Sequence, residues 1–280
     1  MGRWLDSYGL AVHEPRCCSS PEFVPEMRAS LAENVKTVVY ALLIAGLFRT
    51  LLFQPFFIPS SSMKETLLIG DFVFVNKFAY GYSKYSCPFS ACPFSGRIFG
   101  SDPERGDVVV FKHPSSGKDF IKRVVGLPGD RVRLSDGLLY INGKMVRQEP
   151  DGVFNEIFER QGGQRSFPDC SNEPKEGEVC TKSRRTELLP NGVSYSILDT
   201  RQGYGDNTFA TVVPPDEFFV LGDNRDNSQD SRYSRNFGGV GTVPADNLVG
   251  RADLIVFSAA GKSLFYFWTW RRDRFFKAIS

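Results

Sequence analysis

Histidine is nearly absent from this sequence: its 280 residues include only His13 and His113. Histidine is the most common general base in hydrolases, so proton transfer here must rely largely on other side chains. A strong charge of either sign is also missing. The 34 basic and 32 acidic residues leave a formal net charge of +2, and no basic stripe interleaved with aromatics occurs. Nucleic acid is therefore not expected as a partner.

Several well-known motifs are missing or incomplete. No G-x-S-x-G elbow occurs, which removes the usual α/β-hydrolase signature. Ser61–Lys64 has the S-x-x-K spacing of penicillin-binding enzymes, but no K-T-G follows it. Gly261-Lys262-Ser263 resembles the end of a phosphate-binding loop, yet Val256 stands where that loop needs glycine.

The six cysteines are Cys17 and Cys18, Cys87 and Cys92, and Cys170 and Cys180. Neither spaced pair is a C-x-x-C, and histidine is too scarce for a convincing zinc site. No metal and no cofactor are therefore expected. Two local disulfides formed in an oxidising compartment are favoured over free thiols.

A long apolar run begins at Val35 and continues to Phe53, a helix-compatible stretch of 19 residues. This length is close to the roughly 20 residues that span a bilayer. Arg49 lies near its far end, where its charge can reach the interface, and Pro55 ends the helix. The sequence thus predicts a transmembrane anchor, with a buried core helix as the alternative. The flanking charges favour a cytoplasmic N-terminus only weakly.

The pattern changes to extended after the anchor. Short β-branched or aromatic runs, bounded by glycine and proline, occur at residues 71–77, 107–112, 120–125, 132–134, 138–142, 217–221 and 253–257. Many short strands without intervening amphipathic helices predict an all-β sandwich or barrel. Residues 143–213 have few aliphatic runs and are expected to form a β-rich insertion. The aromatic and arginine-rich tail is either an interfacial segment or a helix packed on the core.

Three adjacent serines, Ser60–Ser62, follow the anchor within eight residues of Gln54, a reach of at most about 29 Å. A polar linker is the simplest interpretation of these serines by themselves. In the strand expected at 120–125, Lys122 shares a face with Phe120 and Val124. Burial there lowers a lysine pKa, and a drop of roughly three units makes about half of the molecules neutral at pH 7. Arg123 cannot act as a base, because guanidinium does not deprotonate in proteins.

The loop Gly222–Arg232 contains seven Asp, Asn or Arg residues in eleven positions. Such density favours side-chain-to-backbone hydrogen bonds and an Asp–Arg pair. A calcium loop is disfavoured because the glycine and the terminal glutamate of an EF-hand are missing. The remaining alternative is an exposed turn.

These segments together resemble bacterial type I signal peptidase, the leader peptidase. The resemblance runs in the family's order from about residue 37 to residue 257. Its motifs are Ile58-Pro-Ser-Ser-Ser-Met63, Thr66-Leu-Leu-Ile-Gly-Asp-Phe72, Asn76-Lys-Phe-Ala-Tyr-Gly81, Arg105-Gly-Asp-Val-Val-Val-Phe111, Ile121-Lys-Arg-Val-Val-Gly-Leu-Pro-Gly-Asp130 and Gly222–Arg232. The implied fold is an all-β catalytic domain, the signal-peptidase-like Ser–Lys peptidase fold, with an N-terminal transmembrane helix.

The resemblance also implies roles for single residues. Ser62 matches the nucleophile and Lys122 the general base, a known variant of the serine triad. Ser60 matches the residue whose hydroxyl joins the Ser62 backbone N–H in the oxyanion hole. The lysine would be oriented by Ser228 and supported by an ion pair of Asp230 and Arg232. Pockets for small residues at the −1 and −3 positions of the substrate would be lined by Phe56, Ile58, Met63, Leu67 and Ile121.

The same resemblance implies cleavage of signal peptides from exported preproteins, at a lipid bilayer and near the secretion machinery. The catalytic domain would lie outside the cytoplasmic membrane. The expected division is a cytoplasmic tail (1–34), an anchor (35–54), two parts of a catalytic β core (55–142 and 214–260), a β-rich insertion (143–213) and an aromatic and basic tail (261–280).

Two positions depart from the family pattern. Ser61 stands where the family commonly has glycine, and Glu65 where it commonly has proline. Ser61 is expected to lose backbone freedom next to the nucleophile, and Glu65 to bring a charge near the substrate groove. They are the only features that favour an inert or regulatory membrane-tethered β-domain that binds exported polypeptides. A self-cleaving regulator is a second alternative, but the short N-terminal tail leaves no room for its usual DNA-binding module.

Overall fold

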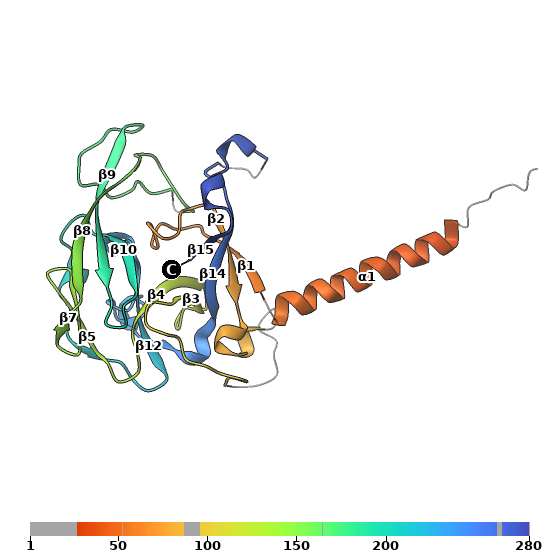
Figure 1. Ribbon diagram of the computed structural model, residues 1–280, viewed down its shortest axis with the longest axis horizontal. Coiled ribbons are helices and arrows are strands. Elements are labelled where there is room, and N and C mark those ends of the chain that lie inside the picture. The colour runs from red at the N-terminus through yellow and green to blue at the C-terminus, as the bar shows by residue number, and fades with distance from the viewer. Residues whose placement is uncertain (1–26, 52, 87–95, 164, 262–264, 280) are drawn as a thin grey trace, which may run out of the picture. The chain divides into compact units, whose positions relative to one another are not determined.

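The computed structural model describes residues 27–51, 53–86, 96–163, 165–261 and 265–279. The chain forms two compact units, Met1–Ile44 and Ala45–Ser280. Helix α1 (Met27–Leu51) is labelled in Figure 1. Its residues up to Ile44 belong to the first unit, and its last residues belong to the second. Among the described residues, none of the helices has both the length and the apolar character that crossing a membrane requires.

The helix ends three residues before the predicted end of the anchor. Phe53 and Gln54 instead begin strand β1 (Phe53–Phe57), so the sequence-based boundary was wrong at this end. Pro55 is compatible with β1 because β1 is the edge strand of its sheet, where a missing N–H donor is tolerated.

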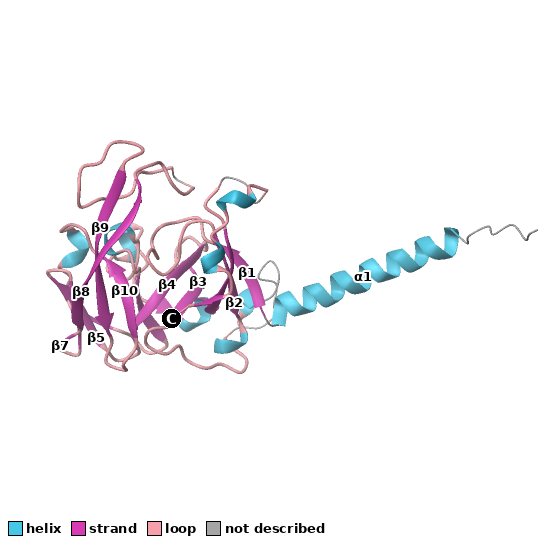
Figure 2. Cartoon of the chain, turned by 45° about the horizontal axis from the view of Figure 1, so that its top comes forward, coloured by secondary structure: helices cyan, strands magenta, loops and turns pink. Residues whose placement is uncertain are grey.

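The second unit is built mostly from antiparallel strands and short 3₁₀ helices (Figure 2). Its largest sheet has the order β1-β2-β14-β3-β4-β12-β13, and β15 pairs with β14. Besides β1, its strands are β2 (Asp71–Asn76), β3 (Val108–Lys112), β4 (Asp119–Gly126), β12 (Glu217–Leu221), β13 (Val243–Pro244), β14 (Leu248–Ser258) and β15 (Lys277–Ala278). The runs predicted at 71–77, 107–112, 120–125, 217–221 and 253–257 each coincide with a strand of this sheet, although Lys77 and Asp107 lie just outside theirs, so those strands are confirmed.

Two smaller sheets complete the unit. One has the order β11-β5-β6-β7 and the other β10-β9-β8. Their strands are β5 (Arg131–Ser135), β6 (Leu138–Ile141), β7 (Lys144–Met145), β8 (Arg147–Ile157), β9 (Val179–Leu188), β10 (Ser194–Leu198) and β11 (Thr211–Val212). The 3₁₀ helices are η1 (Phe78–Tyr80), η2 (Lys84–Ser86), η4 (Tyr204–Asp206), η5 (Arg225–Asn227), η6 (Arg235–Phe237), η7 (Ala245–Asn247), η8 (Phe267–Thr269) and η9 (Arg272–Arg274). The segment between 143 and 213 is thus rich in strands, as its composition led us to expect.

The centre of the main sheet is buried on both faces. In β3, Val108 and Val110 join one hydrophobic cluster, whereas Val109 and Phe111 join another. This alternation follows from the two-residue period of a strand. A third cluster joins residues of β5 and β6 to residues of β10 and β12. The sheet that carries Lys122 is therefore enclosed by packed side chains on either side.

The predictions for the cysteines and for the C-terminal tail can also be compared with the structure. Cys170 and Cys180 form a disulfide, as predicted, whereas Cys87 and Cys92 lie outside the described residues. The described part of the tail, 265–279, contains short 3₁₀ helices and β15 but no α-helix, so the helical alternative for the tail was wrong. Arg274 holds the tail to the core by donating to both carboxylate oxygens of Asp71 at 3.2 and 2.6 Å.

Candidate active site

The segment that carries Ser62 is fixed to the main sheet on its N-terminal side. The Ile58 N–H donates to the carbonyl of Asp71 at 2.9 Å, and the Gly70 N–H donates to the carbonyl of Ile58 at 3.0 Å. After Ile58 the chain turns tightly. Met63 and Leu67 anchor this turn in the core, because both side chains are fully buried. Ser62 is thus presented from a rigid turn and is itself only 8% exposed.

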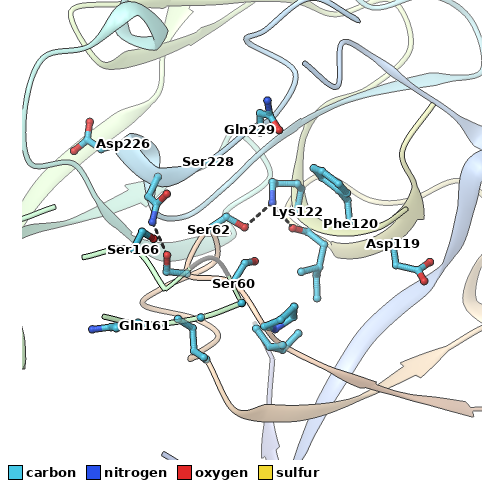
Figure 3. A pocket seen from close by; sticks show the side chains of 18 of the residues that line it. Ser60, Ser62, Asp119, Phe120, Lys122, Gln161, Ser166, Asp226, Ser228 and Gln229 are labelled. Atoms are coloured by element: carbon cyan, nitrogen blue, oxygen red, sulfur yellow. Dashed lines mark hydrogen bonds between the residues drawn. The ribbon is translucent and has the colours of Figure 1, made fainter. Parts of the chain in front are cut away.

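Ser62 and Lys122 meet although 60 residues separate them. The Nζ of Lys122 lies 2.6 Å from the Oγ of Ser62 and also donates to the carbonyl of Ile121 at 2.8 Å. Figure 3 shows the two side chains pointing toward each other across the pocket. Lys122 comes from β4, where it pairs with Val109 of β3, and it is only 3% exposed.

The surroundings of Lys122 favour its neutral form. Burial lowers its pKa from 10.5 to about 8, although the charges of Asp230 and Asp223 act in the opposite direction. A lysine with this pKa is neutral in about one molecule in ten at pH 7, against about one in 3,000 at a pKa of 10.5. The pair therefore has the two parts of a base-activated nucleophile, a hydroxyl and an amine able to accept its proton.

The loop after β12 holds the turn that carries Ser62 in place. The Asn224 N–H donates to the carbonyl of Ser62 at 3.1 Å, and its side-chain amide donates to the carbonyl of Ser61 at 3.0 Å. The amide of Asn227 donates to the Oγ of Ser61 at 2.5 Å. This polar loop is therefore not an exposed turn. It is a structured segment that supports the turn around Ser62.

Asp230 and Arg232 form a fully buried ion pair in the same loop, with the Nε of Arg232 2.8 Å from Oδ1 of Asp230. Burial alone would raise the pKa of Asp230. The charge and hydrogen bonds of Arg232, with a smaller contribution from Ser228, instead hold this pKa below its ordinary value. The pair thus stays ionised behind the site.

Ser228 lies beside the nucleophile turn and is 8% exposed. A Cβ placed on Gly222 would come within 2.2 Å of Ser228 Oγ and 2.6 Å of the Ser62 carbonyl, so only glycine fits there. Within the described part of the chain, the Ser228 hydroxyl has no hydrogen bond of ordinary geometry, and none joins it to Lys122.

One supporting pair was not singled out from the sequence. Arg123 donates to both oxygens of Asp223, from Nε at 2.9 Å and from Nη2 at 2.8 Å, and both side chains are buried. Arg123 follows the base directly and Asp223 opens the polar loop, so the pair ties β4 to that loop. The sequence offered one signal for this pair: Arg123 stands in an apolar strand, where a buried arginine needs an acidic partner, and the loop 222–232 is rich in Asp.

The pocket around Ser62 has a volume of about 1400 Å³. Of the five predicted substrate-binding residues, Phe56, Ile58 and Ile121 line it. Met63 and Leu67 do not, because they are fully buried in the core.

Ser60 is exposed and lines the pocket next to Ser62. None of the described residues accepts a hydrogen bond from the Ser60 hydroxyl or from the Ser62 N–H. Two donors thus stand available beside the nucleophile. Among the described residues, no three His, Cys, Asp or Glu side chains are grouped so that they could hold a metal ion.

The structure shows the surroundings of Ser61 and Glu65, the two residues that depart from the family pattern. Ser61 does not adopt a positive φ, so the backbone at this position does not need the freedom of glycine. Glu65 does not line the pocket, and its Oε1 lies 3.5 Å from Nη1 of Arg184 in β9. The expected charge near the substrate groove is therefore directed toward the insertion instead.

His113 has a local structural role. It is 4% exposed, and its Nδ1 accepts hydrogen bonds from the N–H groups of Ser115 and Ser116 at 3.1 and 3.2 Å. Burial and the charge of Arg235 lower its pKa. His113 does not line the pocket around Ser62.

The sequence matches the family model "Signal peptidase, peptidase S26" over residues 31–257. Signal peptidase I of Rickettsia canadensis (strain McKiel) is 39% identical over 240 residues, covering 81% of this chain and 80% of the relative. The enzyme of the same name from Rickettsia typhi (strain ATCC VR-144 / Wilmington) is 35% identical, covering 82% and 81%. A crystal structure of a signal peptidase I from Enterococcus faecalis V583 aligns with a TM-score of 0.29 at 26% identity, covering 54% of this chain and 97% of that chain. This chain belongs to the signal peptidase family, peptidase S26.

Proposed function

We propose that this protein is a signal peptidase I, a serine endopeptidase that removes signal peptides from exported preproteins with Ser62 and Lys122. The observation that carries the mechanism is the 2.6 Å contact between Ser62 Oγ and the Nζ of a buried lysine. Membership of the peptidase S26 family supports the substrate class.

The reaction follows from these positions. Neutral Lys122 accepts the proton of Ser62 as Oγ attacks the carbonyl carbon of the scissile bond. The Ser62 N–H and the Ser60 hydroxyl then donate to the oxyanion. Lys122 returns the proton to the leaving amine, and an acyl-enzyme forms on Ser62. Lys122 next takes a proton from water, whose oxygen attacks the acyl carbon. Lys122 then gives this proton to Ser62 Oγ as the acyl bond breaks, which releases the signal peptide and restores both side chains.

The neighbouring residues have supporting roles in this proposal. Ser228, whose buried hydroxyl lies beside the nucleophile turn, orients Lys122 when substrate binds. Asp230 and Arg232 keep that loop in place. Small residues at −1 and −3 fit against Phe56, Ile58 and Ile121, and the buried Met63 and Leu67 shape the pockets from behind.

We further propose a membrane location. The helical part of the predicted anchor, residues 35–51, forms a single pass through the cytoplasmic membrane, because aliphatic side chains of α1 such as Leu42 and Ile44 are 67% and 68% exposed. The N-terminus (1–34) is cytoplasmic and the catalytic domain extracytoplasmic, where the Cys170–Cys180 disulfide persists.

In this arrangement the bilayer and the secretion machinery are partners. The catalytic core comprises 55–142 and 214–260, with the insertion at 143–213. The tail, 261–280, presents exposed aromatics to the membrane interface, Phe265 at 89% and Trp268 at 69%.

The test is preprotein cleavage in detergent or lipid by the full chain and by two variants, Ser62→Ala and Lys122→Ala. Both variants are expected to lose cleavage while remaining folded. Full activity in either variant would contradict the Ser–Lys mechanism. Absence of cleavage by the wild type would favour the inert β-domain.

A further inference from the structure

A tight turn from the insertion is seated on the segment that leads to the nucleophile. We call it the Gln161 turn (residues 161–163, 165 and 166). Within it, the Gln161 N–H donates to the Ser166 carbonyl at 2.9 Å. The Gly163 N–H donates to the carbonyl of Pro59 at 3.3 Å. Gly162 has a φ of +67°, and a Cβ there would lie 2.8 Å from the same carbonyl, so glycine permits the close approach. Pro59 stands three residues before Ser62.

A buried polar cluster, which we call the latch, holds this turn. It consists of Lys64, Glu156, Gln161 and Lys182. Lys64 stands two residues after the nucleophile, and its Nζ donates to Oε1 of Gln161 at 2.6 Å and to Oε2 of Glu156. The amide of Gln161 also donates to that carboxylate at 2.7 Å. The other oxygen of Glu156 lies 2.9 Å from the Nζ of Lys182.

The latch is well enclosed, because Lys64 is 3% exposed and Lys182 is 1% exposed. Burial opposes ionisation of Glu156, yet the two lysines hold its pKa below the ordinary value. The single carboxylate of Glu156 thus binds two lysines in a largely buried cluster, and these contacts fix the geometry of the three side chains. The insertion is therefore joined rigidly to the nucleophile turn.

The pocket has two halves on either side of Ser62. Asp119 and Phe120 lie with Lys122 on one side, whereas Gln161 and Ser166 lie on the opposite side (Figure 3). A polypeptide cleaved at Ser62 has the residues before and after the scissile bond on opposite sides of the nucleophile. In the proposed function, the residues before the bond occupy the half that includes Ile121.

We propose that the Gln161 turn, latched by Lys64 and Glu156, forms the binding wall for the first residues after the scissile bond. It thereby determines which preprotein N-termini the enzyme accepts. This inference rests on the proposed function and adds a specificity element to it. The wall offers the glycine backbone of residues 162 and 163 and the small Ser166, so it leaves room for side chains of different size.

Gly163 allows a sharp test. It lines the pocket, its φ is not in the left-handed region, and a Cβ placed on it meets nothing within 4 Å. Gly163→Leu therefore adds bulk to the wall without a clash at its Cβ. The matched control is Gly203→Leu, because Gly203 is extended at φ −139°, meets nothing within 4 Å and does not line the pocket.

The experiment measures kcat/KM for full-length enzyme in detergent on peptides that carry Ala or Phe at the first or second position after the scissile bond. A second series varies −1 and −3. For peptides that differ after the scissile bond, Gly163→Leu is expected to lower the ratio of kcat/KM for Phe to kcat/KM for Ala about tenfold or more. For peptides that differ at −1 or −3, the variant is expected to keep the kcat/KM ratios of the wild type. Gly203→Leu is expected to match the wild type in both series.

A double variant tests the latch. Gln161→Ala frees the turn from Lys64, so adding it to Gly163→Leu is expected to restore most of the lost ratio. An unchanged ratio in the double variant would show that the latch does not hold the wall.

Two further results would overturn the inference while leaving the proposed function standing. One is an altered −1 or −3 ratio in Gly163→Leu, and the other is a wild-type ratio at every position. Loss of the proposed function would appear differently, as failure of the wild type to cleave any peptide of either series.

Discussion

Replacing Lys122 with methionine should abolish cleavage and yet make the protein more stable. In the folded protein, burial lowers the pKa of Lys122 from 10.5 to about 8. Below pH 8 the lysine is protonated in both the folded and unfolded states, and the folded state bears the full cost of the buried charge. At about 1.4 kcal/mol per pKa unit, this cost is about 3 kcal/mol. Methionine has a similar length and no charge, so it removes the cost.

The net gain is smaller than this cost. Methionine cannot replace the hydrogen bonds of Nζ to Ser62 Oγ and the Ile121 carbonyl, whose loss costs about 1 kcal/mol. We therefore expect Lys122→Met to raise the free energy of unfolding by about 2 kcal/mol at pH 7. Between pH 8 and 10.5 the unfolded state binds more protons than the folded state, so the wild type becomes more stable as the pH rises. The advantage of the variant should shrink by about 1 kcal/mol between pH 7 and pH 9.

The assay is urea unfolding of the detergent-solubilised chain, followed by tryptophan fluorescence, at pH 7 and pH 9. Trp270 packs against Phe257 with ring centroids 5.0 Å apart, so unfolding changes its surroundings. Lys112→Met is the matched control, because Lys112 is also a strand lysine but is 23% exposed and pairs with Asp119. A variant less stable than the wild type at pH 7, or an advantage that grows with pH, would refute the reasoning that burial sets the state of Lys122.

Two other predictions follow from the same site. The kcat/KM for preprotein cleavage should rise about tenfold per pH unit below pH 8 and level off above it, because the neutral fraction of Lys122 limits the reaction. A profile that is flat from pH 6 to 8 would point to another base. His113→Ala should keep most of the activity, since the ring binds its own turn and does not line the pocket. Purified variant and wild type should be compared on one peptide, and a complete loss would implicate His113 in catalysis.

The central strands could be predicted from sequence because their apolar residues form continuous runs. In β3, four of the five side chains are buried, so burial on both faces selects β-branched and aromatic residues throughout. Strands β8 and β9 contain mainly polar and charged residues, and their side chains are mostly exposed or half-buried. Composition indicated a β-rich insertion there, but pairing across the hairpin, and not hydrophobicity, defines the boundaries of its strands.

The catalytic pair could be proposed from sequence only through the family resemblance. Ser62 resembles a linker serine and Lys122 an ordinary strand lysine until the fold brings them to 2.6 Å. The partners of Lys64 could not be foreseen, because Glu156 lies 92 positions away in a strand without a clear sequence pattern. Contacts of this kind depend on how the insertion docks on the core, and no local pattern records that.

The pKa of Lys122 depends on how its neighbouring carboxylates are paired. Asp230 and Asp223 both favour the protonated lysine and, left as free charges, would keep it a cation. Each is bound by a guanidinium, Asp230 by Arg232 at 2.8 Å and Asp223 by Arg123 at 2.9 Å. The charge of Arg232 lowers the pKa of Lys122 and so offsets part of this attraction, and desolvation outweighs the remainder. Arginine suits this task because its guanidinium stays protonated even in a dry site. In the proposed mechanism, the Asp230–Arg232 pair therefore does more than hold its loop: Arg232 helps to keep part of the Lys122 population neutral.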